Sequence, residues 1–302
     1  MIFLNVFICH INAALTLPLS LASLIELLST LQIIHILLKT MAAFLTPKQF
    51  ILNALFQNIS YLTGGFEISG IYPLHPLIKP FWFIFAAYLA VFAAVNIVAL
   101  GQFFLKKKPT KGVAFVLAEA YTIHARVLFF PIQFLFSYLL SLYQQNDDTR
   151  LFYNQPGWLT ATIVLTILNH VFAIIKEFLL YQITMNERNT LAAKNNLYHQ
   201  TILVHKIVIL LMFFASQENR IVMKMTSIVH LLAFTVIWWI LRIKLPFYNF
   251  RIFKYISIST AINYNLAFIS IIQVFSTGQK IHGCVDFLTL LLPVFTVKII
   301  LS

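Results

Sequence analysis

The stretch from Phe81 to Leu105 is largely apolar and carries no formal charge, and a basic cluster that begins at Lys106 follows it. A helix needs about 20 residues to cross a hydrocarbon core that is about 30 Å thick. This stretch is therefore long enough to span a bilayer. Similar stretches recur along the rest of the chain with few polar intervals. The sequence therefore predicts an integral membrane protein that crosses the bilayer as α-helices.

Composition supports a membrane protein and excludes an ordinary soluble domain. The 302 residues are 60% hydrophobic and 10% charged, whereas soluble domains contain about 25% charged residues. The net charge of +12 would suggest a nucleic-acid partner in a soluble protein. Here most cations fall in short loops between apolar stretches, so we expect them to meet lipid headgroups, anionic ones included. We expect no nucleic-acid partner.

The apolar stretches predict an all-α, polytopic transmembrane bundle of about eight spans, with a range of about seven to nine. The spans are expected near residues 18–39, 80–105, 113–143, 157–184, 200–216, 224–243, 250–276 and 284–301. The whole chain, 1–302, is interpreted as one transmembrane domain, and 40–79 as an extramembrane or interfacial connection within it. Residues 1–17 are also apolar, and the pattern leaves open whether they form an extra helix.

Pro131 lies inside the predicted span 113–143, which is longer than one untilted crossing requires. A proline in a helix removes a backbone hydrogen bond, so we expect a kink or a break there. Basic residues concentrate in the loops on one side of the predicted spans, for example at Lys106 to Lys111 and at Arg251 and Lys254. The positive-inside rule then predicts that both termini are cytoplasmic. The sequence does not indicate which membrane holds the protein.

Ionisable side chains within the predicted spans are the best functional candidates, because burying a charge in a membrane is costly. The candidate intramembrane polar site consists of Glu119, His124, Arg126, Lys176, Glu177 and Lys206. Lys176 and Glu177 are adjacent, so they point in different directions and need partners from other helices. One interpretation is a proton or ion path, or a polar ligand pocket. The other is that these residues form structural pairs or extend to the membrane interface.

Motifs of enzymes and metal sites are missing from the sequence. It has no nucleotide-binding glycine loop, no HExxH pair and no GxSxG turn. The nine histidines show no paired spacing on one helix face, and the two cysteines are too few for a zinc site. We therefore expect no enzymatic activity, no metal and no cofactor.

A turn between the sixth and seventh predicted spans carries basic and aromatic residues. Pro246 should interrupt the helix, and Asn249 can cap the next one. We name this turn the cytoplasmic elbow, and its candidate residues are Arg242, Lys244, Pro246, Tyr248, Asn249 and Arg251. It is interpreted either as a tight turn that contacts headgroups or as a docking surface for a cytoplasmic domain or an anionic lipid.

Three short motifs resemble a known family. They are the Leu-Pro-Phe-Tyr-Asn turn at 245–249, the Ile-Glu-Leu-Leu-Ser-Thr-Leu-Gln stretch at 25–32 and Leu-Phe-Phe-Pro at 128–131. Together they are similar to the multi-span region of tiny-macrocysts-type proteins of ciliates and amoebae. In that family cytoplasmic sensor domains of the PAS kind often follow the membrane region, so the resemblance implies sensing or signalling. It carries over no catalytic or ligand-binding residue.

Three functional classes follow from these observations. The resemblance favours a sensing or signalling membrane module without enzymatic activity. The buried ionisable residues favour a transporter or channel instead. A compact, basic bundle with few loops also suits an accessory subunit, whose partners would be the other subunits of a membrane complex.

Overall fold

The structure, a computed structural model, describes residues 11, 18–42, 78–105, 111–144, 156–180, 195–215, 220–244, 246–247, 249–275, 288–289, 291–292 and 298. Within them, seven helical segments are long and apolar enough to cross a membrane. The predicted all-α class is therefore confirmed, and the number of spans lies within the predicted range.

These segments lie where the apolar stretches predict them. They are Leu19–Leu38, Lys79–Phe104, Gly112–Leu140, Pro156–Leu179, Leu197–Phe214, Ile221–Lys244 and Phe250–Phe275. Their ends differ from the predicted ends by a few residues, because capping and packing decide where a helix stops. The predicted span 284–301 and the connection 40–79 lie almost entirely outside the described residues.

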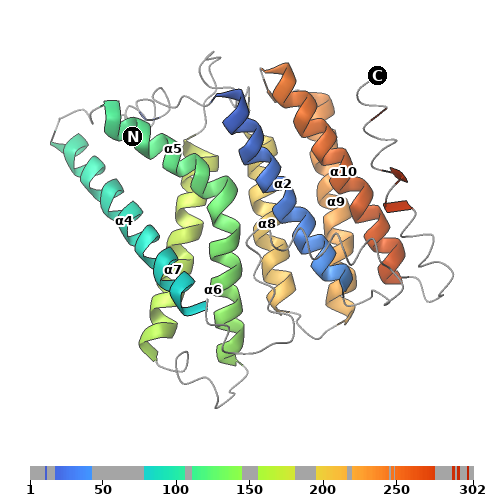
Figure 1. Cartoon of the computed structure of the whole chain (residues 1–302), viewed down its shortest axis with the longest axis horizontal. Helices are drawn as coiled ribbons and strands as arrows, with labels where there is room; N and C mark the ends of the chain where they lie inside the picture. The colour runs from blue at the N-terminus through green and yellow to red at the C-terminus, as the bar shows by residue number, and fades with distance from the viewer. Residues whose placement is uncertain are drawn as a thin grey trace. The chain divides into compact units, whose positions relative to one another are not determined.

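The described helices group into two compact units. The first holds α4 (Ile78–Phe104), α5 (Lys111–Ile123), the π-helical turn η1 (His124–Leu128), α6 (Phe129–Gln144), α7 (Pro156–Ile174) and the π-helical turn η2 (Ile175–Leu179). The second holds α2 (Leu19–Ala42), α8 (Leu197–Ala215), α9 (Arg220–Lys244) and α10 (Phe250–Phe275) (Figure 1). The interpretation of residues 1–302 as one domain stays a prediction.

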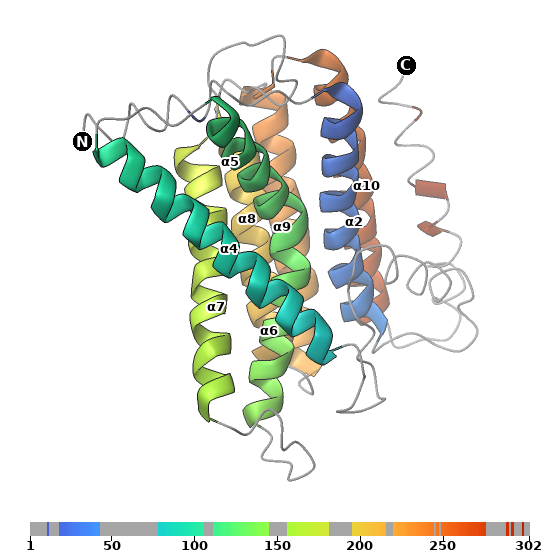
Figure 2. The same cartoon turned by 60° about the vertical axis from the view of Figure 1, so that its left-hand side comes forward.

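In the first unit, α6 packs along α7, and α4 contacts both helices. Figure 2 shows α4 running obliquely across this pair. The indole Nε1 of Trp82 on α4 donates a hydrogen bond to Oγ1 of Thr162 on α7 at 3.1 Å. Without water at membrane depth, an indole N–H needs such a protein partner, so this bond helps to fix α4 against α7.

The third described span is interrupted close to Pro131, as the sequence predicts. α5 ends at Ile123, five residues follow in π-helical geometry, and α6 begins at Phe129. Pro131 cannot donate a hydrogen bond to the carbonyl of Val127, and its ring clashes with that carbonyl in a regular α-helix. The π-helical turn contains Val127 and widens the backbone there. Figure 1 shows that α5 and α6 run in different directions.

In the second unit, α10 packs against α9 and α2, and α8 packs against α9. Short polar side chains join these helices. Oγ of Ser227 lies 2.9 Å from Oγ of Ser270, and Oγ1 of Thr30 lies 2.5 Å from Oγ of Ser259. Small residues allow helices to approach closely in a membrane, and their hydroxyl groups bond across the interface.

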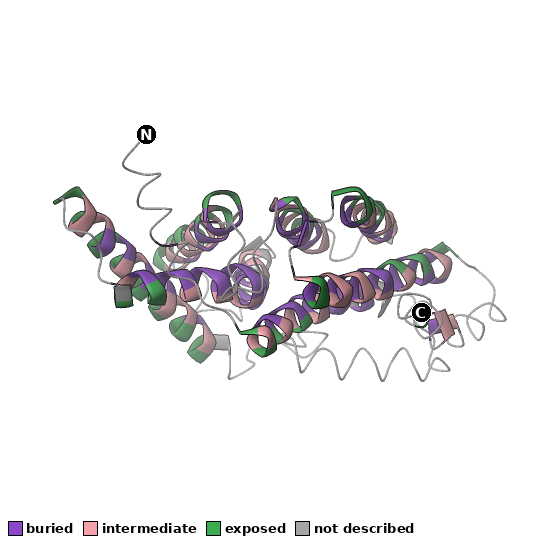
Figure 3. Ribbon diagram, turned by 90° about the horizontal axis from the view of Figure 1, so that it is seen from above, coloured by how far each residue is buried: buried purple, intermediate pink, exposed green. Residues whose placement is uncertain are grey.

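The exposed sides of the helices are apolar, whereas several charged side chains are buried. Val91 and Ile97 on α4 are 63% and 70% exposed. Arg126, Lys176 and Lys206 are buried. Figure 3 shows the buried and exposed sides along each helix. This distribution is the reverse of that in a water-soluble protein, and it fits a surface that faces lipid.

Candidate functional site

An ion pair between Arg126 and Glu177 lies inside the first unit. The Nε atom of Arg126 is 3.3 Å from Oε1 of Glu177. The two side chains are 7% and 3% exposed, so water screens their attraction only weakly. Removing two charges from water is costly, and the pair recovers part of that cost through this attraction.

Both members of the pair stand in π-helical turns. Arg126 lies in η1 and Glu177 in η2. At the end of η2, the N–H of Leu180 bonds to the carbonyl oxygen of Ile175 at 3.0 Å, five residues back. Such turns are rare and are frequent at functional sites. The two turns bring Arg126 and Glu177 together from different helices.

Lys176 forms its hydrogen bond in another direction. Its Nζ donates to the carbonyl oxygen of Leu180 at 2.7 Å, beyond the last residue of η2. Its charge also interacts with Glu177, Arg126 and Glu119. When all four are ionised, these two cations and two carboxylates sum to zero charge. The prediction of a partner from another helix is thus confirmed for Glu177, whereas the hydrogen bond of Lys176 is local.

His124 links α4 and α7 from its position in η1. Its Nε2 lies 3.2 Å from the carbonyl oxygen of Asn169, and its Nδ1 lies 3.3 Å from the hydroxyl of Tyr88. A carbonyl oxygen can only accept, so Nε2 carries the proton and Nδ1 accepts from Tyr88. His124 is therefore held in one tautomer by two helices.

Asn169 continues this polar contact towards α6. Its Nδ2 donates at 3.3 Å both to the carbonyl oxygen of Phe129 and to Oε1 of Gln133. Asn169 is fully buried. Together with His124 and Tyr88, it forms a line of hydrogen bonds across the first unit. Buried polar groups in a membrane protein need such partners.

Lys206 belongs to the second unit and is almost fully buried. Its Nζ donates hydrogen bonds to Oγ of Ser29 and to Oε1 of Gln32, each at 2.9 Å. Both partners lie on α2, one turn apart. Also in this unit, Nδ1 of His199 lies 3.9 Å from Oε1 of Glu26. Lys206 and His199 on α8 therefore face polar and acidic groups on α2.

At the elbow, Asn249 caps α10. Oδ1 of Asn249 accepts hydrogen bonds from the N–H of Arg251 at 2.9 Å and of Ile252 at 3.3 Å, which confirms the predicted cap. Pro246 is buried. Arg242, Lys244 and Arg251 are exposed, and Tyr248 lies outside the described residues.

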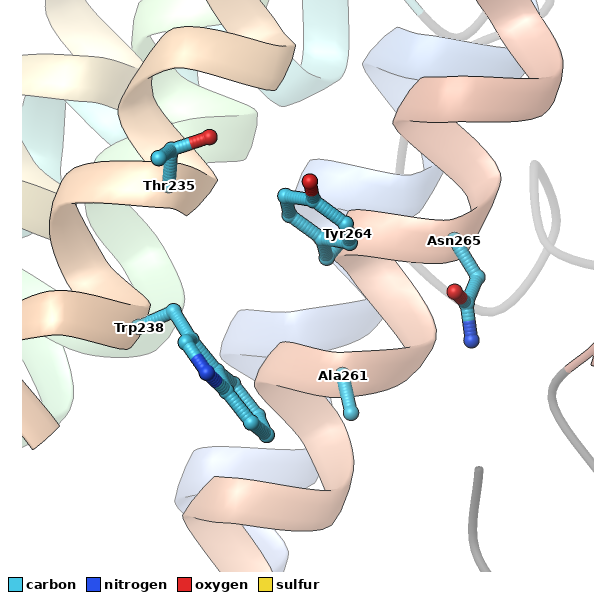
Figure 4. A pocket seen from close by; sticks show the side chains of 5 residues that line it. All are labelled: Thr235, Trp238, Ala261, Tyr264 and Asn265. Carbon is cyan, nitrogen blue, oxygen red and sulfur yellow. The ribbon is translucent and has the colours of Figure 1, made fainter. Parts of the chain in front are cut away.

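A pocket of about 310 Å³ lies between α9 and α10 (Figure 4). Its lining is mainly apolar with a few polar groups, from Thr235, Trp238, Ala261, Tyr264 and Asn265. None of these residues carries a charge at neutral pH. None of the predicted intramembrane residues is among these lining residues. Among the described residues, no three histidine, cysteine or acidic side chains gather as they would around a metal.

The structure brings together most of the predicted intramembrane residues in the first unit. Arg126, Glu177, Lys176 and Glu119 interact there through charge, and His124 stands in the same π-helical turn as Arg126. Lys206 belongs to the second unit. The sequence reasoning missed the partners of these groups. Tyr88, Asn169, Ser29 and Gln32 are common polar residues, and no spacing in the sequence marks them.

Long apolar helices, apolar exposed surfaces and paired charges in the interior define a multi-pass integral membrane protein. No protein family, curated protein or solved structure matches the chain.

Proposed function

We propose that this protein conducts protons across its membrane through buried ionisable side chains. Glu177 and Lys176 are the groups that bind and release protons, and Arg126 is the fixed counter-charge. The observation that carries this proposal is the buried ion pair with its neighbouring cation inside the spans. Ionisable residues in that position are expensive and typically functional.

The energetics of the pair support function over a purely structural role. A buried ion pair is weak evidence for stability, because apolar residues of similar volume often stabilise a protein equally well. Here Lys176 adds a third buried charge, and Glu119 on α5 interacts with it. A bundle that only anchors a partner in lipid has no need for such a cluster.

Protons fit the geometry better than larger solutes do. Arg126 and Glu177 lie at ion-pair distance, and the charge of Lys176 interacts with Glu177, Arg126 and Glu119. A larger solute would need a space of its own size beside these groups. A proton moves along side chains and requires no such space.

The charges suggest how a proton can pass. A proton that binds the carboxylate of Glu177 neutralises it and leaves the four-residue cluster with one excess positive charge. Loss of a proton from the ammonium of Lys176 restores neutrality. Uptake of a proton at Glu177 therefore favours release of a proton at Lys176, because an excess charge is costly in a medium of low dielectric constant.

Proton flux in liposomes tests this function. The purified protein is reconstituted in vesicles that contain a pH-sensitive dye, and a potassium diffusion potential drives the flux. We expect wild-type vesicles to change pH faster than protein-free vesicles. The Glu177→Gln and Lys176→Met variants should lower that rate by about a hundredfold, the contribution typical of a positioned proton-transfer group.

A matched control separates chemistry from folding. Arg242→Gln removes an exposed charge from the second unit and should leave the flux unchanged. Lys176→Met keeps the Arg126–Glu177 pair, so it reports on function even if Glu177→Gln does not fold. Equal rates in wild-type and protein-free vesicles would refute proton conduction.

A second candidate function is a sensing module, which the resemblance implies. The observation that favours it is the elbow, where exposed Arg242, Lys244 and Arg251 surround a capped turn. Such a surface suits a separate cytoplasmic domain or anionic headgroups. Co-purification in mild detergent tests it: a bound cytoplasmic domain should be lost in Arg251→Glu. Retention of other membrane subunits in that variant would favour an accessory subunit instead.

A further inference from the structure

Two histidines form a buried pair in the second unit. His205 on α8 and His230 on α9 are 4% and 0% exposed. Nε2 of His205 lies 3.1 Å from Nδ1 of His230, which is hydrogen-bond distance. The outer atoms, Nδ1 of His205 and Nε2 of His230, have no hydrogen-bond partner in the part of the chain that the structure describes.

This geometry allows two arrangements of protons on a neutral pair. In the first, Nε2–H of His205 donates to His230, which then carries its own proton on the outer Nε2. In the second, Nδ1–H of His230 donates to His205, which then carries its own proton on the outer Nδ1. A neutral imidazole has one donor and one acceptor nitrogen, so these are the arrangements that keep the hydrogen bond.

The hydrogen bonds of the described residues favour neither arrangement, because neither outer nitrogen has a partner among them. Each leaves one buried N–H at one end of the pair and one bare nitrogen at the other. The ring of Phe234 packs edge-on against His205, with 5.3 Å between ring centroids. His124 differs in this respect, because a backbone carbonyl fixes its tautomer.

The charged and polar groups of this unit come from α8, α2, α9 and α10. Lys206 follows His205 in sequence and acts on it electrostatically. Its ammonium group is held by Ser29 and Gln32. Glu26, also on α2, lies beside His199. From α10, Ser270 bonds to Ser227, one turn before His230. In the described part of the chain, Lys206 is thus the cation that acts on the pair, and the ring of Phe234 packs against it.

We propose that His205 and His230 form a proton relay that passes one proton between their two outer nitrogens. The relay rests on the proposed proton conduction and identifies a second conducting element of this protein. It uses residues that the conduction proposal does not involve.

Each step moves one proton and breaks no other bond. A proton binds Nδ1 of His205, and the Nε2 proton of the same ring passes to Nδ1 of His230. The Nε2 proton of His230 then leaves. The pair has changed from the first arrangement to the second, and one proton has been taken up and one released. Return to the first arrangement requires rotation of the rings or passage of a proton in the opposite direction.

Nitrogen NMR of the histidine-labelled protein in lipid nanodiscs tests the relay without relying on flux. We expect a ¹⁵N–¹⁵N coupling across the hydrogen bond that is lost in His230→Phe. We also expect signals of both tautomers for each ring of the pair, and one tautomer for His124. A single fixed tautomer for His205 and His230, or no coupling between them, would overturn the relay.

Flux through variants tests whether the relay conducts. His205→Gln and His230→Asn replace each facing nitrogen with an amide that can form a hydrogen bond but cannot pass a proton through itself. Each should lower the proton flux in liposomes at least tenfold. His170→Gln is the matched control, since His170 lies in the first unit and bonds only locally to the carbonyl of Thr166 in the described part of the chain.

The outcomes separate the two proposals. Wild-type flux that persists in both His205→Gln and His230→Asn overturns the relay and leaves the conduction proposal intact. An absence of wild-type flux overturns the conduction proposal and, with it, the conducting role of the pair. Both tautomers in the NMR spectrum, together with the loss of flux, support the relay.

Discussion

Arg126 and Glu177 meet at 3.3 Å, and each stands in a π-helical turn of a different helix. A regular α-helix at either position would rotate one side chain away from the other. Pro131 gives a physical reason for the first turn, because it cannot complete the hydrogen-bond ladder at Val127. In this structure, a backbone irregularity therefore coincides with the site where buried charges are paired.

The stability of the pair can be measured by a double-mutant cycle. Glu177→Met and Arg126→Met each break the buried pair and should each lower the free energy of unfolding by about 3–5 kcal/mol. Combining Arg126→Met with Glu177→Met removes both charges and should restore most of that loss. Thermal unfolding of the purified protein in detergent reports both effects. Additive losses in the double variant would show that the two residues do not interact.

The hydrogen bonds of Lys206 allow a similar test in the second unit. Gln32→Leu removes an acceptor on α2 from the buried ammonium group of Lys206 and should lower stability by about 1.5–3 kcal/mol. In a Lys206→Met background, the same change should have little effect, because no charge remains to be solvated. An equal loss of stability in both backgrounds would show that Gln32 stabilises the protein through contacts other than its hydrogen bond to Lys206.

We predict that the cap of α10 stabilises the elbow. Asn249→Ala should lower stability by about 1 kcal/mol, since it removes the acceptor of two backbone N–H groups. Asn249→Asp keeps the acceptor and serves as the control. Hydrogen exchange at Arg251 and Ile252 should speed up in the alanine variant alone. Unchanged exchange at these two amides would contradict the cap.

Cysteine labelling tests which surfaces face lipid. In a background where Cys9 and Cys284 are replaced by serine, Ile97→Cys should resist a charged, water-soluble maleimide because this position faces lipid. Arg251→Cys, at the exposed elbow, should react quickly. The basic loops predict that the elbow is cytoplasmic. In that case Arg251→Cys should not react in intact cells and should react after the membrane is permeabilised. Fast labelling of Ile97→Cys would contradict the lipid-facing surface.

The spans were predictable because length and hydropathy decide which segments enter a membrane. Seven predicted spans correspond to described helices. The break near Pro131 was also predictable, since proline marks it chemically. The second π-helical turn, which contains Glu177, has no proline and no comparable signal. The chain leaves helical geometry at Leu180, directly after this turn.

The members of the candidate site were predictable, but their partners were not. Arg126 and Glu177 stand out as charges within apolar segments. Their pairing joins two helices, and spacing along the sequence reveals only which residues share a face of one helix. The contact between His205 and His230 was missed for the same reason. The spacing within each helix gives no hint that these two histidines meet.

The most direct test of proton conduction is the reversal potential of the current across a planar bilayer that contains the protein. With opposing gradients of protons and potassium, the proposal predicts a reversal potential that follows the proton gradient, and a current that is lost in Lys176→Met. A reversal potential that follows the potassium gradient, or a bilayer that carries no current with the protein present, would contradict it.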